Sequence, residues 1–423
     1  MRKKRIVSLL ACGVIAAGTT VGLTACSSND GITVWGSQDE QATLQQMVDL
    51  FLEQNSDVTI PIKVGVASAA DAVTNLSVDA TVGADVYCYV NDQLINLINY
   101  TALQPIPEAA VARIKEANTE ASVNSAELNG DYYGYPYAAD NGYFLYYNKN
   151  IMTEEEAGSL EGILEACKKN RKYFIYNMTE AWYVGAFFLG TAEGCVGGTY
   201  NVEYEGTVVS SAGTNFDQNV PGTEYSIAKV GGDAMVRLNS NKWFISGDDS
   251  TIAQYLTGDG TDTMFGACIS GTWNASLIQE KLGDGYAATK LPTFHSEVTG
   301  GDYQMGSLMG YKHFGVNPHT KHASEAHRLA EFLTSEAMQE LRFDNLQTGP
   351  SNKNVAKLPK IGESVALSAL IKQGDYATPQ GVFPDSYWNA MKAFGGNVCG
   401  QTPTITLDNL DDKLADFIKA FKE

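Results

Sequence analysis

The sequence lacks the short motifs that mark most catalytic and nucleotide-binding sites. It contains no H-E-x-x-H, no G-x-x-x-x-G-K-[ST] and no G-x-S-x-G, so it offers no zinc-protease, P-loop or nucleophile-elbow signature. Only five histidines are present, all between His295 and His327. Because the spacing of His319, His322 and His327 fits no pair on one helix face, we expect neither a metal nor another cofactor. These absences lower the expectation of catalysis without excluding it.

Cysteine is also scarce. Of the seven cysteines, Cys12 and Cys26 belong to the leader described below. The other five are widely spaced, odd in number and free of any C-x-x-C pattern; they are Cys88, Cys167, Cys195, Cys268 and Cys399. This pattern argues against a dense disulfide framework. We expect buried, small apolar side chains, while one or two disulfides stay open for a protein outside the cytoplasm.

The first 26 residues have the organisation of a lipoprotein leader. A basic segment, Arg2 to Arg5, precedes an uncharged apolar stretch over 6–23, and Leu23-Thr24-Ala25-Cys26 follows. We interpret residues 1–25 as a signal peptide, Cys26 as the lipidated residue and 26–31 as a linker. The alternative is one transmembrane anchor, but the apolar run is short and interrupted by Gly and Thr. The leader predicts a protein lipid-anchored to the extracellular face of the bacterial cytoplasmic membrane.

Basic residues are few compared with acidic ones. The chain has 29 Lys and Arg against 49 Asp and Glu, a formal net charge of −20. Residues 1–25 carry four basic side chains, so their removal makes the charge more negative still. Such a surface repels nucleic acid and anionic lipid, and favours a neutral or cationic ligand. The rest of the chain has no second long apolar run and exceeds one ordinary core, so we expect two soluble lobes.

Hydrophobic patterning predicts an α/β protein. Strands over 32–35, 58–66 and 86–90 alternate with helices over 44–51, 73–82 and 94–98, which is typical of a lobe with a mainly parallel sheet. The pattern changes near Ala138 and Ala139, where we expect the chain to cross into a second lobe. Beyond this point the sequence predicts strands over 144–149, 264–269 and 313–317, helices over 162–169, 181–190, 228–240 and from 324, and a hairpin excursion over 194–221.

Aromatic residues accompany carboxylates just after several expected strands. Tyr89 lies three residues before Asp92, Glu180 lies two residues before Trp182, and Trp273 follows a strand directly. Ligands of open α/β sheets bind outside the carboxyl ends of the strands. Indole and phenol rings stack on the C–H face of a sugar, and carboxylates accept its hydroxyl protons. The pattern therefore predicts a sugar-binding cleft, whereas Trp35 and Trp243, which lie in apolar runs, read as core residues.

Several segments together resemble a known family. They are Ile32-Thr33-Val34-Trp35-Gly36-Ser37-Gln38-Asp39, Gly83-Ala84-Asp85-Val86, Gly134-Tyr135-Pro136 through Tyr147-Asn148-Lys149, Lys290-Leu291-Pro292-Thr293-Phe294, Gly315-Val316-Asn317, and Ala330-Glu331-Phe332-Leu333. Over nearly the whole mature chain the sequence resembles an extracellular solute-binding protein of the maltose/maltodextrin-binding type, the receptor of an ABC sugar importer. Such a receptor is a monomer that passes its ligand to membrane permease subunits.

The resemblance implies a fold class, a domain division and a site. The fold is the α/β, two-lobe periplasmic-binding-protein-like fold (type II, maltose-binding-like) with an interlobe hinge and a ligand cleft. The N-terminal lobe would comprise 32–138 plus 314–362, and the C-terminal lobe 139–313 plus 363–423. The ligand-binding positions that it implies are Asp39, Glu40, Tyr89, Asp92, Asp140, Glu180, Trp182, Trp273, Trp388 and Lys392. The retained Trp273, Trp388 and Glu180 favour a maltooligosaccharide as the ligand.

Departures from the family pattern keep alternatives open. Glu40 stands where a lysine contacts the ligand, and Gln93 and Lys392 stand where arginines do. Another neutral oligosaccharide, such as a β-linked one, therefore stays an alternative. So does a surface protein that only holds starch. The remaining alternative is a glycosidase with Asp140 and Glu180 as its acid and base, but several stacking rings without a dedicated acid motif favour a binding protein rather than an enzyme.

Overall fold

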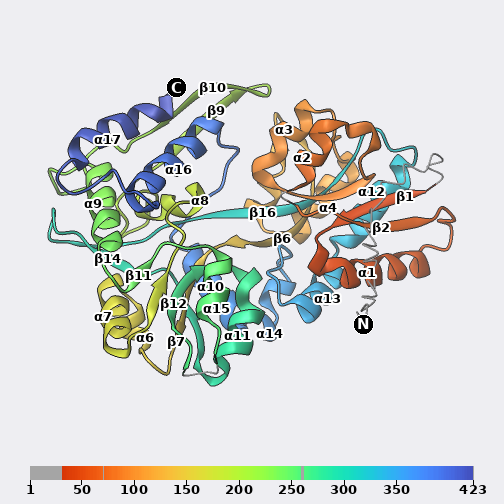
Figure 1. The fold of residues 1–423 in the computed structure, drawn as a ribbon. Coiled ribbons are helices and arrows are strands. Elements are labelled where there is room, and N and C mark those ends of the chain that lie inside the picture. Colours follow the sequence, from red (N-terminus) through yellow and green to blue (C-terminus); the bar gives the residue numbers. More distant parts are fainter. Residues whose placement is uncertain (1–30, 70, 259–261, 423) are drawn as a thin grey trace, which may run out of the picture.

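The chain folds into two α/β lobes joined by long strands, as Figure 1 shows for the computed structural model. The structure describes residues 31–69, 71–258 and 262–422. The predicted signal peptide, the lipidated Cys26 and nearly all of the linker lie outside the described residues. No helix formed by the described residues is long and apolar enough to cross a membrane.

The N-terminal lobe contains a mixed sheet in the order β17-β16-β3-β1-β2, and β6 also pairs with β16. Its strands are β1 (Ile32–Gly36), β2 (Ile62–Val66), β3 (Val86–Val90), β6 (Tyr135–Gly142), β16 (Ser307–Val316) and β17 (Ala377–Pro379). The strands β2, β1 and β3 are parallel, as the alternation of strands and helices predicts. The sheet is nevertheless mixed, because β16 runs antiparallel to both β3 and β6.

Both faces of this sheet are buried because its strands alternate their side chains between two hydrophobic clusters. In β3, Val86 and Cys88 join one cluster, and Tyr87 and Tyr89 join the other. A strand buried on both faces reads as a continuous apolar run, which is why the sequence predicts β3 correctly. The helices of this lobe are α1 (Gln41–Gln54), α2 (Asp71–Val78), α3 (Leu94–Asn99), α4 (Glu108–Ala117), α5 (Glu120–Asn124), α12 (Ala323–Leu333) and α13 (Glu336–Leu346).

The C-terminal lobe contains the second sheet, which has five strands in the order β11-β8-β12-β7-β13. Its strands are β7 (Phe144–Asn148), β8 (Tyr173–Ile175), β11 (Phe244–Ile245), β12 (Phe265–Ser270) and β13 (Tyr286–Thr289). The side chains of β7 alternate in the same way, since Leu145 and Tyr147 face one cluster while Phe144 and Tyr146 face another. The strands β8 and β12 are parallel neighbours, so their carboxyl ends lie at one edge.

Helices cover both faces of the second sheet (Figure 1). The helices of this lobe are α6 (Glu154–Ala157), α7 (Leu160–Asn170), α8 (Ala181–Val184), α9 (Ile227–Asn239), α10 (Asp249–Tyr255), α11 (Ala275–Leu282), α14 (Pro359–Glu363), α15 (Val365–Gly374), α16 (Asp385–Cys399) and α17 (Leu410–Lys419). Short strand pairs complete the fold: β4 (Glu127–Leu128) with β5 (Asp131–Tyr132), β9 (Tyr200–Glu205) with β10 (Val208–Thr214), and β14 (Thr293–His295) with β15 (Asp302–Gln304). The β9–β10 pair is the predicted hairpin excursion.

Three segments cross between the lobes. The strands β6 and β16 run from one lobe into the other, and β17 pairs with the first residues of β16. The expected lobe boundaries at 138/139 and 313/314 fall within β6 and β16. Because these strands belong to both lobes, the division of the chain at single residues stays a prediction.

Some predicted elements differ from the observed ones in length. The strand expected over 58–66 begins only at Ile62, and the helix expected over 73–82 ends at Val78 before a short 3-10 turn. The strand expected over 313–317 is instead the ten-residue β16, which begins at Ser307. Before His313, β16 contains Ser307, Gly310 and Lys312, so the sequence pattern indicates only the last part of the strand.

The five cysteines among the described residues are free thiols. Four of them are buried and Cys399 is partly exposed, so they act as the small core side chains that the sequence predicts. Within the described part of the chain, no group of three or more His, Cys, Asp or Glu side chains could hold a metal ion.

Candidate sugar-binding site

Two indole rings meet at the carboxyl edge of the second sheet. Trp182 lies on α8, which follows β8, and Trp273 follows β12 directly. Their ring centroids are 5.9 Å apart and the ring planes differ by 35°. Because β8 and β12 are parallel neighbours, the fold brings together two residues that are 91 positions apart in the chain. We call these two rings the Trp182–Trp273 platform.

Trp273 is held at its polar edge and is partly exposed. The residue is 44% exposed, and its Nε1–H donates to Asp249 Oδ2 at 3.0 Å. The other carboxylate oxygen of Asp249 accepts from Asn274 Nδ2 at 2.7 Å and from Ser270 Oγ at 3.3 Å. Asp249 therefore fixes the indole while leaving its apolar surface to a ligand. Sequence reasoning missed Asp249, because a carboxylate in the first turn of a helix reads as a favourable helix end.

Gln380 connects the platform to the N-terminal lobe. Its Oε1 accepts from Trp182 Nε1 at 3.0 Å, and its Nε2 donates to Asp92 Oδ2 at 2.8 Å. Asp92 follows β3, so a residue from each lobe is bonded to one buried amide. Gln380 itself is anchored, since its backbone N–H donates to Met309 O and its backbone oxygen accepts from Asn91 Nδ2. A lone glutamine in an irregular segment carries no sequence signal, so this contact could not be predicted.

Asp92 is a buried carboxyl group with one open acceptor. Burial raises its pKa to about 6, although the hydrogen bond from Gln380 acts in the opposite direction. Its second oxygen, Oδ1, is buried and receives no hydrogen bond from the described residues. An unsatisfied buried acceptor at a point where two lobes meet is suited to the hydroxyl group of a ligand.

Glu40 and Asp140 lie in a buried ion-pair cluster with Arg342 and Lys312. Arg342 Nη2 is 2.5 Å from Glu40 Oε1, and Arg342 Nη1 is 3.4 Å from Asp140 Oδ2. Lys312 Nζ lies 3.4 Å from the other oxygen of Asp140. Burial would raise the pKa of Asp140, but the cations of Lys312 and Arg342 outweigh it and hold that pKa below its usual value.

This cluster changes the interpretation of both acids. Asp140 is 1% exposed and Glu40 is buried, so their carboxylates are occupied by cations rather than presented to a ligand. Lys312 is the most exposed member, with 26% of its side chain accessible. No sequence pattern indicates the burial of Arg342, because an arginine in a helix ordinarily lies on the solvated face.

Tyr89 also differs from its expected position. The resemblance implies a ring that faces the cleft, but Tyr89 is 0% exposed and belongs to the core of the N-terminal lobe. Its ring packs against His313 at 5.5 Å between centroids. Because side chains along β3 alternate between the two faces of the sheet, the Tyr89 ring lies in the hydrophobic core. The ring therefore offers no stacking surface in this structure. The role of Tyr89 in ligand binding stays a prediction.

The other expected residues lie nearer the surface. Glu180 caps α8 and its Oε2 is 3.6 Å from Lys392 Nζ, with both side chains substantially exposed. Trp388 on α16 is partly buried, and its Nε1 donates to Phe383 O at 3.1 Å. Asp39 follows β1 and is exposed. The structure thus brings Glu180 to Lys392 and Trp182 to Trp273, while Trp388 packs edgewise on Tyr387 at 5.0 Å.

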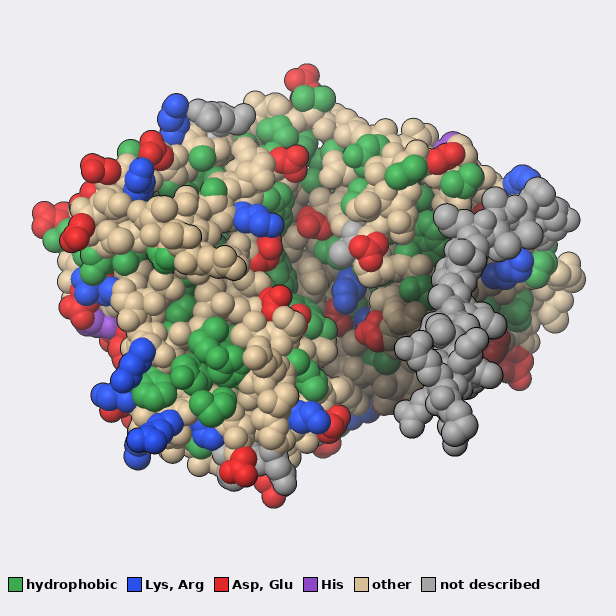
Figure 2. All heavy atoms as spheres, in the orientation of Figure 1, with side chains coloured by type: hydrophobic (Ala, Val, Ile, Leu, Met, Phe, Trp, Pro, Cys, Tyr) green, Lys and Arg blue, Asp and Glu red, His purple; other side chains and the backbone are tan. Residues whose placement is uncertain are grey.

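The surface between the lobes is hollowed. Figure 2 shows this hollow, with acidic side chains along both of its sides. Two α/β lobes, three crossing segments and a hollow between the lobes define a two-lobe binding protein with the type II fold of maltose-binding proteins. More particularly, the chain belongs to the family of bacterial extracellular solute-binding proteins. The match to this family covers residues 46–369.

Solved structures of similar fold cover almost the whole chain. A protein solved with acarbose is 26% identical, with a TM-score of 0.78 over 93% of this chain and 99% of its own. The maltodextrin-binding protein MalE1 from L. casei BL23, solved without ligand, is 21% identical, with a TM-score of 0.74 over 93% and 99%. A cyclo/maltodextrin-binding protein complexed with maltotetraose is 18% identical, with a TM-score of 0.68 over 94% and 98%. No curated protein sequence matches the chain.

Proposed function

We propose that this protein captures neutral oligosaccharides, and maltooligosaccharides in particular, between its lobes and delivers them to an ABC importer. In this proposal Cys26 carries the lipid that holds the protein at the outer face of the bacterial cytoplasmic membrane. The protein acts as a receptor and not as an enzyme. Structures of similar fold were solved with acarbose and with maltotetraose, which supports an α-glucan as the first ligand to test.

The Trp182–Trp273 platform is the observation that carries the proposal. Both indole N–H groups are already bonded to Gln380 and Asp249, so the rings have only apolar surface left to offer. A sugar ring needs that surface for its C–H face and nearby acceptors for its hydroxyls. We assign Glu180, Asp92 and the exposed Asp39 as these acceptors. Lys392 lies beside Glu180, and Trp388 belongs to the same lobe as the platform.

Ligand binding would close the lobes about their crossing strands. We expect the sugar to dock first on the C-terminal lobe, which holds both platform rings, and the N-terminal lobe then to close on it with Asp92. The free energy for closure is the ligand's higher affinity for the closed state. In the closed state the sugar is desolvated, which strengthens its hydrogen bonds to carboxylates.

Asp140 and Glu180, the two acids of the glycosidase alternative, do not form a suitable catalytic pair. A glycosidase acid needs a raised pKa so that it holds a proton at neutral pH. The pKa of Asp140 is instead lowered by Lys312 and Arg342, and Glu180 lies beside Lys392. These contacts favour binding over hydrolysis. Incubation with maltoheptaose should release no shorter products, and turnover that disappears in Glu180→Gln would contradict the receptor assignment.

Calorimetric titration of the Trp273→Ala variant tests the proposal. Loss of the stacking face should weaken maltooligosaccharide binding by about tenfold or more, since about 1.4 kcal/mol of stacking free energy corresponds to tenfold. Trp388→Ala should act in the same direction. Trp243→Phe is the matched control, because Trp243 precedes β11 and so lies at the amino edge of the parallel strands β11 and β8.

The ligand series decides the sugar class. Maltose, maltotriose and longer α-glucans are compared with cellotriose and xylotriose. Tighter binding of the α-linked series supports the proposal, and tighter binding of a β-linked sugar selects the alternative neutral oligosaccharide. Unchanged affinity in both Trp273→Ala and Trp388→Ala would show that the ligand does not occupy this cleft.

A further inference from the structure

Three large apolar side chains are exposed in two neighbouring segments of the N-terminal lobe. Val78 at the end of α2 is 86% exposed, Val82 is 76% exposed, and Tyr100, directly after α3, is also exposed. Val82 ends the short 3-10 turn Ala80–Val82, which begins two residues after Val78. We call these three side chains the amino-edge patch.

Hydrogen bonds place both segments at the amino edge of the sheet. The strands β1 and β3 are parallel, and Val82 lies four residues before β3 begins. Asp85 N–H donates to Thr33 O near the start of β1 at 3.0 Å, and the Asp85 carboxylate accepts from Thr33 N–H at 2.7 Å. Tyr87, near the start of β3, donates its hydroxyl to Ala102 O at 2.7 Å, so the segment after α3 returns to the same edge.

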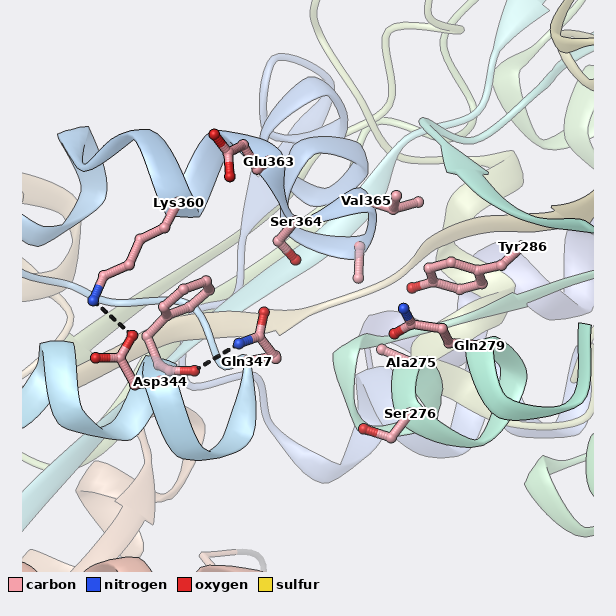
Figure 3. Close-up of a pocket in the computed structure, with 12 residues that line it drawn as sticks. Ala275, Ser276, Gln279, Tyr286, Asp344, Gln347, Lys360, Glu363, Ser364 and Val365 are labelled. Atoms are coloured by element: carbon pink, nitrogen blue, oxygen red, sulfur yellow. Dashed lines mark hydrogen bonds and ion pairs between the residues drawn. The ribbon is translucent and has the colours of Figure 1, made fainter. Parts of the chain in front are cut away.

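Val365, another exposed apolar side chain, lies in different surroundings. It lines a cavity of about 370 Å³ between α11 and the segment formed by α13, α14 and α15. Figure 3 shows charged side chains in the wall of this cavity, including Lys360 and Asp344, which are paired at 2.6 Å. Val365 is therefore one apolar member of a mostly polar wall and not part of an apolar face.

The segments that carry the amino-edge patch are almost free of charge. Asp79 is the only charged residue in 73–84 and 93–107, although the whole chain has a formal net charge of −20. Its carboxylate already accepts from the backbone N–H of Thr81 at 2.9 Å and from the hydroxyl of Thr81 at 2.6 Å. Because a strongly acidic surface is repelled by an anionic bilayer, a face of this kind can approach such a bilayer at lower electrostatic cost.

A loop with basic side chains adjoins the patch. Directly after β16, Asn317 Nδ2 donates to Ala80 O at 2.8 Å, which brings this loop against the turn that ends at Val82. His319 and Lys321 follow in the loop, and both are exposed. Apolar side chains with basic residues beside them are the combination that binds the interface of an anionic bilayer.

From this arrangement we infer that the amino-edge patch rests on the lipid bilayer to which the protein is anchored. Valine side chains suit the boundary between headgroups and acyl chains, and tyrosine is a typical residue of that boundary. Asp92 follows the opposite, carboxyl end of β3, so this contact leaves the sugar-binding cleft open to solvent. Because it depends on the lipidation of Cys26, the contact rests on the proposed function.

The distance from the anchor to the fold makes this weak contact effective. Cys26 is six residues before Ile32, the first residue of β1. Even a fully extended chain of that length spans only about 20 Å, so the amino edge stays close to the headgroups. A tether of this length gives the patch a high effective concentration at the bilayer. Three side chains that would not hold a free protein on a membrane can therefore orient an anchored one.

Hydrogen exchange measured by mass spectrometry tests this orientation. The lipidated protein is reconstituted in vesicles of equal parts phosphatidylethanolamine and phosphatidylglycerol, and it is compared with a soluble protein of residues 26–423 that carries Cys26→Ser. We expect the amides of 77–84 and 99–103 to exchange about fivefold more slowly on vesicles, since this corresponds to a patch that is free of the bilayer for about one fifth of the time. Amides of α17 in the other lobe should exchange equally in both samples.

Variants identify the side chains responsible. The triple variant Val78→Ser, Val82→Ser and Tyr100→Ser should lose the protection while remaining folded and lipidated, because the three side chains are exposed. The matched control is Val208→Ser with Val209→Ser, which changes two exposed valines of the β9–β10 hairpin and should keep the protection. Thermal unfolding checks the fold of each variant.

The outcomes separate this inference from the proposed function. Equal exchange on vesicles and in solution, or protection that the triple variant retains, would overturn this inference while the proposed function stands. Protection of the same segments in concentrated soluble protein would assign the patch to a second copy of the chain and would also overturn it. If the mass of the membrane-bound protein shows no lipid on Cys26, the anchoring in the proposed function fails, and this inference fails with it.

Discussion

At the scale of single residues, the site contains indole rings whose N–H groups are hydrogen-bonded to neighbouring side chains of the protein. Asp249 accepts from Trp273, and Gln380 accepts from Trp182. A buried indole N–H without an acceptor would cost free energy, so these partners are needed wherever a Trp serves as a platform. They also fix the ring orientation before the ligand arrives, which reduces the entropy lost on binding.

Asp92 gives the site a predictable dependence on pH. Its pKa is raised to about 6 by burial, so it is a carboxylate at pH 7 and becomes protonated as the pH falls below 6. A neutral acid accepts a weaker hydrogen bond than a carboxylate by about 1 kcal/mol. We therefore expect oligosaccharide affinity to fall about fivefold between pH 7 and pH 5, as calorimetric titration would measure.

The variant Asp92→Asn separates this residue from other titrating groups. It is uncharged throughout this range, so its affinity, although lower at pH 7, should not vary with pH between 7 and 5. Asp39→Asn is the comparison, because Asp39 is exposed and should leave the wild-type pH profile in place. A full wild-type pH profile in Asp92→Asn would show that another group is responsible.

At the scale of elements, Arg342 connects three parts of the N-terminal lobe. It lies on α13, and its guanidinium is paired with Glu40 before α1 and with Asp140 on β6. The ring of Tyr137 on β6 lies 4.4 Å from the guanidinium carbon. With 2% of the side chain exposed, these contacts replace hydration almost completely. Arg342 thus holds a helix against a strand that crosses between the lobes.

Replacement of this arginine should therefore be severe. Arg342→Met leaves Glu40 and Asp140 as buried acids with only Lys312 nearby, and we expect a loss of about 3–5 kcal/mol in the free energy of unfolding. Urea unfolding measures this loss. The matched control is Arg328→Met on α12, whose partner Asp57 is exposed, and it should change stability little.

A double variant identifies the cause. Because the penalty comes from uncompensated buried charge, Glu40→Gln combined with Arg342→Met should recover part of the stability lost in Arg342→Met alone. If the double variant is less stable than Arg342→Met, packing of the arginine stem, rather than its charge, accounts for the effect.

Elements with one strong pattern could be predicted from the sequence, and contacts between distant segments could not. The run Val86–Val90 and the spacing of Leu44, Met47, Val48 and Phe51 identify β3 and α1 without ambiguity. By contrast, β16 begins at Ser307 in a polar stretch, and its position is set by pairing with β3, β6 and β17. Long-range pairing, which no local pattern encodes, determines such a strand.

The same limit applies to the site. Trp182, Trp273, Glu180 and Asp92 could be proposed because they follow strands whose carboxyl ends face a common edge. The ion pairs of Glu40 and Asp140 could not be predicted, since their partner Arg342 is more than two hundred residues away in the chain. Their role as ligand contacts stays a prediction. A buried ion pair between distant residues has no sequence signature.

At the scale of the whole molecule, crossing strands and hydrogen bonds connect the two lobes. The strands β6 and β16 cross between them, and Gln380 bonds Asp92 of one lobe to Trp182 of the other. We expect the lobes to move as bodies about the crossing strands. A ligand that contacts both lobes then selects the closed arrangement.

The position of a bound maltooligosaccharide in a crystal of the complex is the decisive measurement. We predict sugar rings stacked on Trp182 and Trp273 and a hydroxyl group within hydrogen-bond distance of Asp92 Oδ1. A sugar bound outside the hollow between the lobes, with the faces of both indoles unoccupied, would contradict the account.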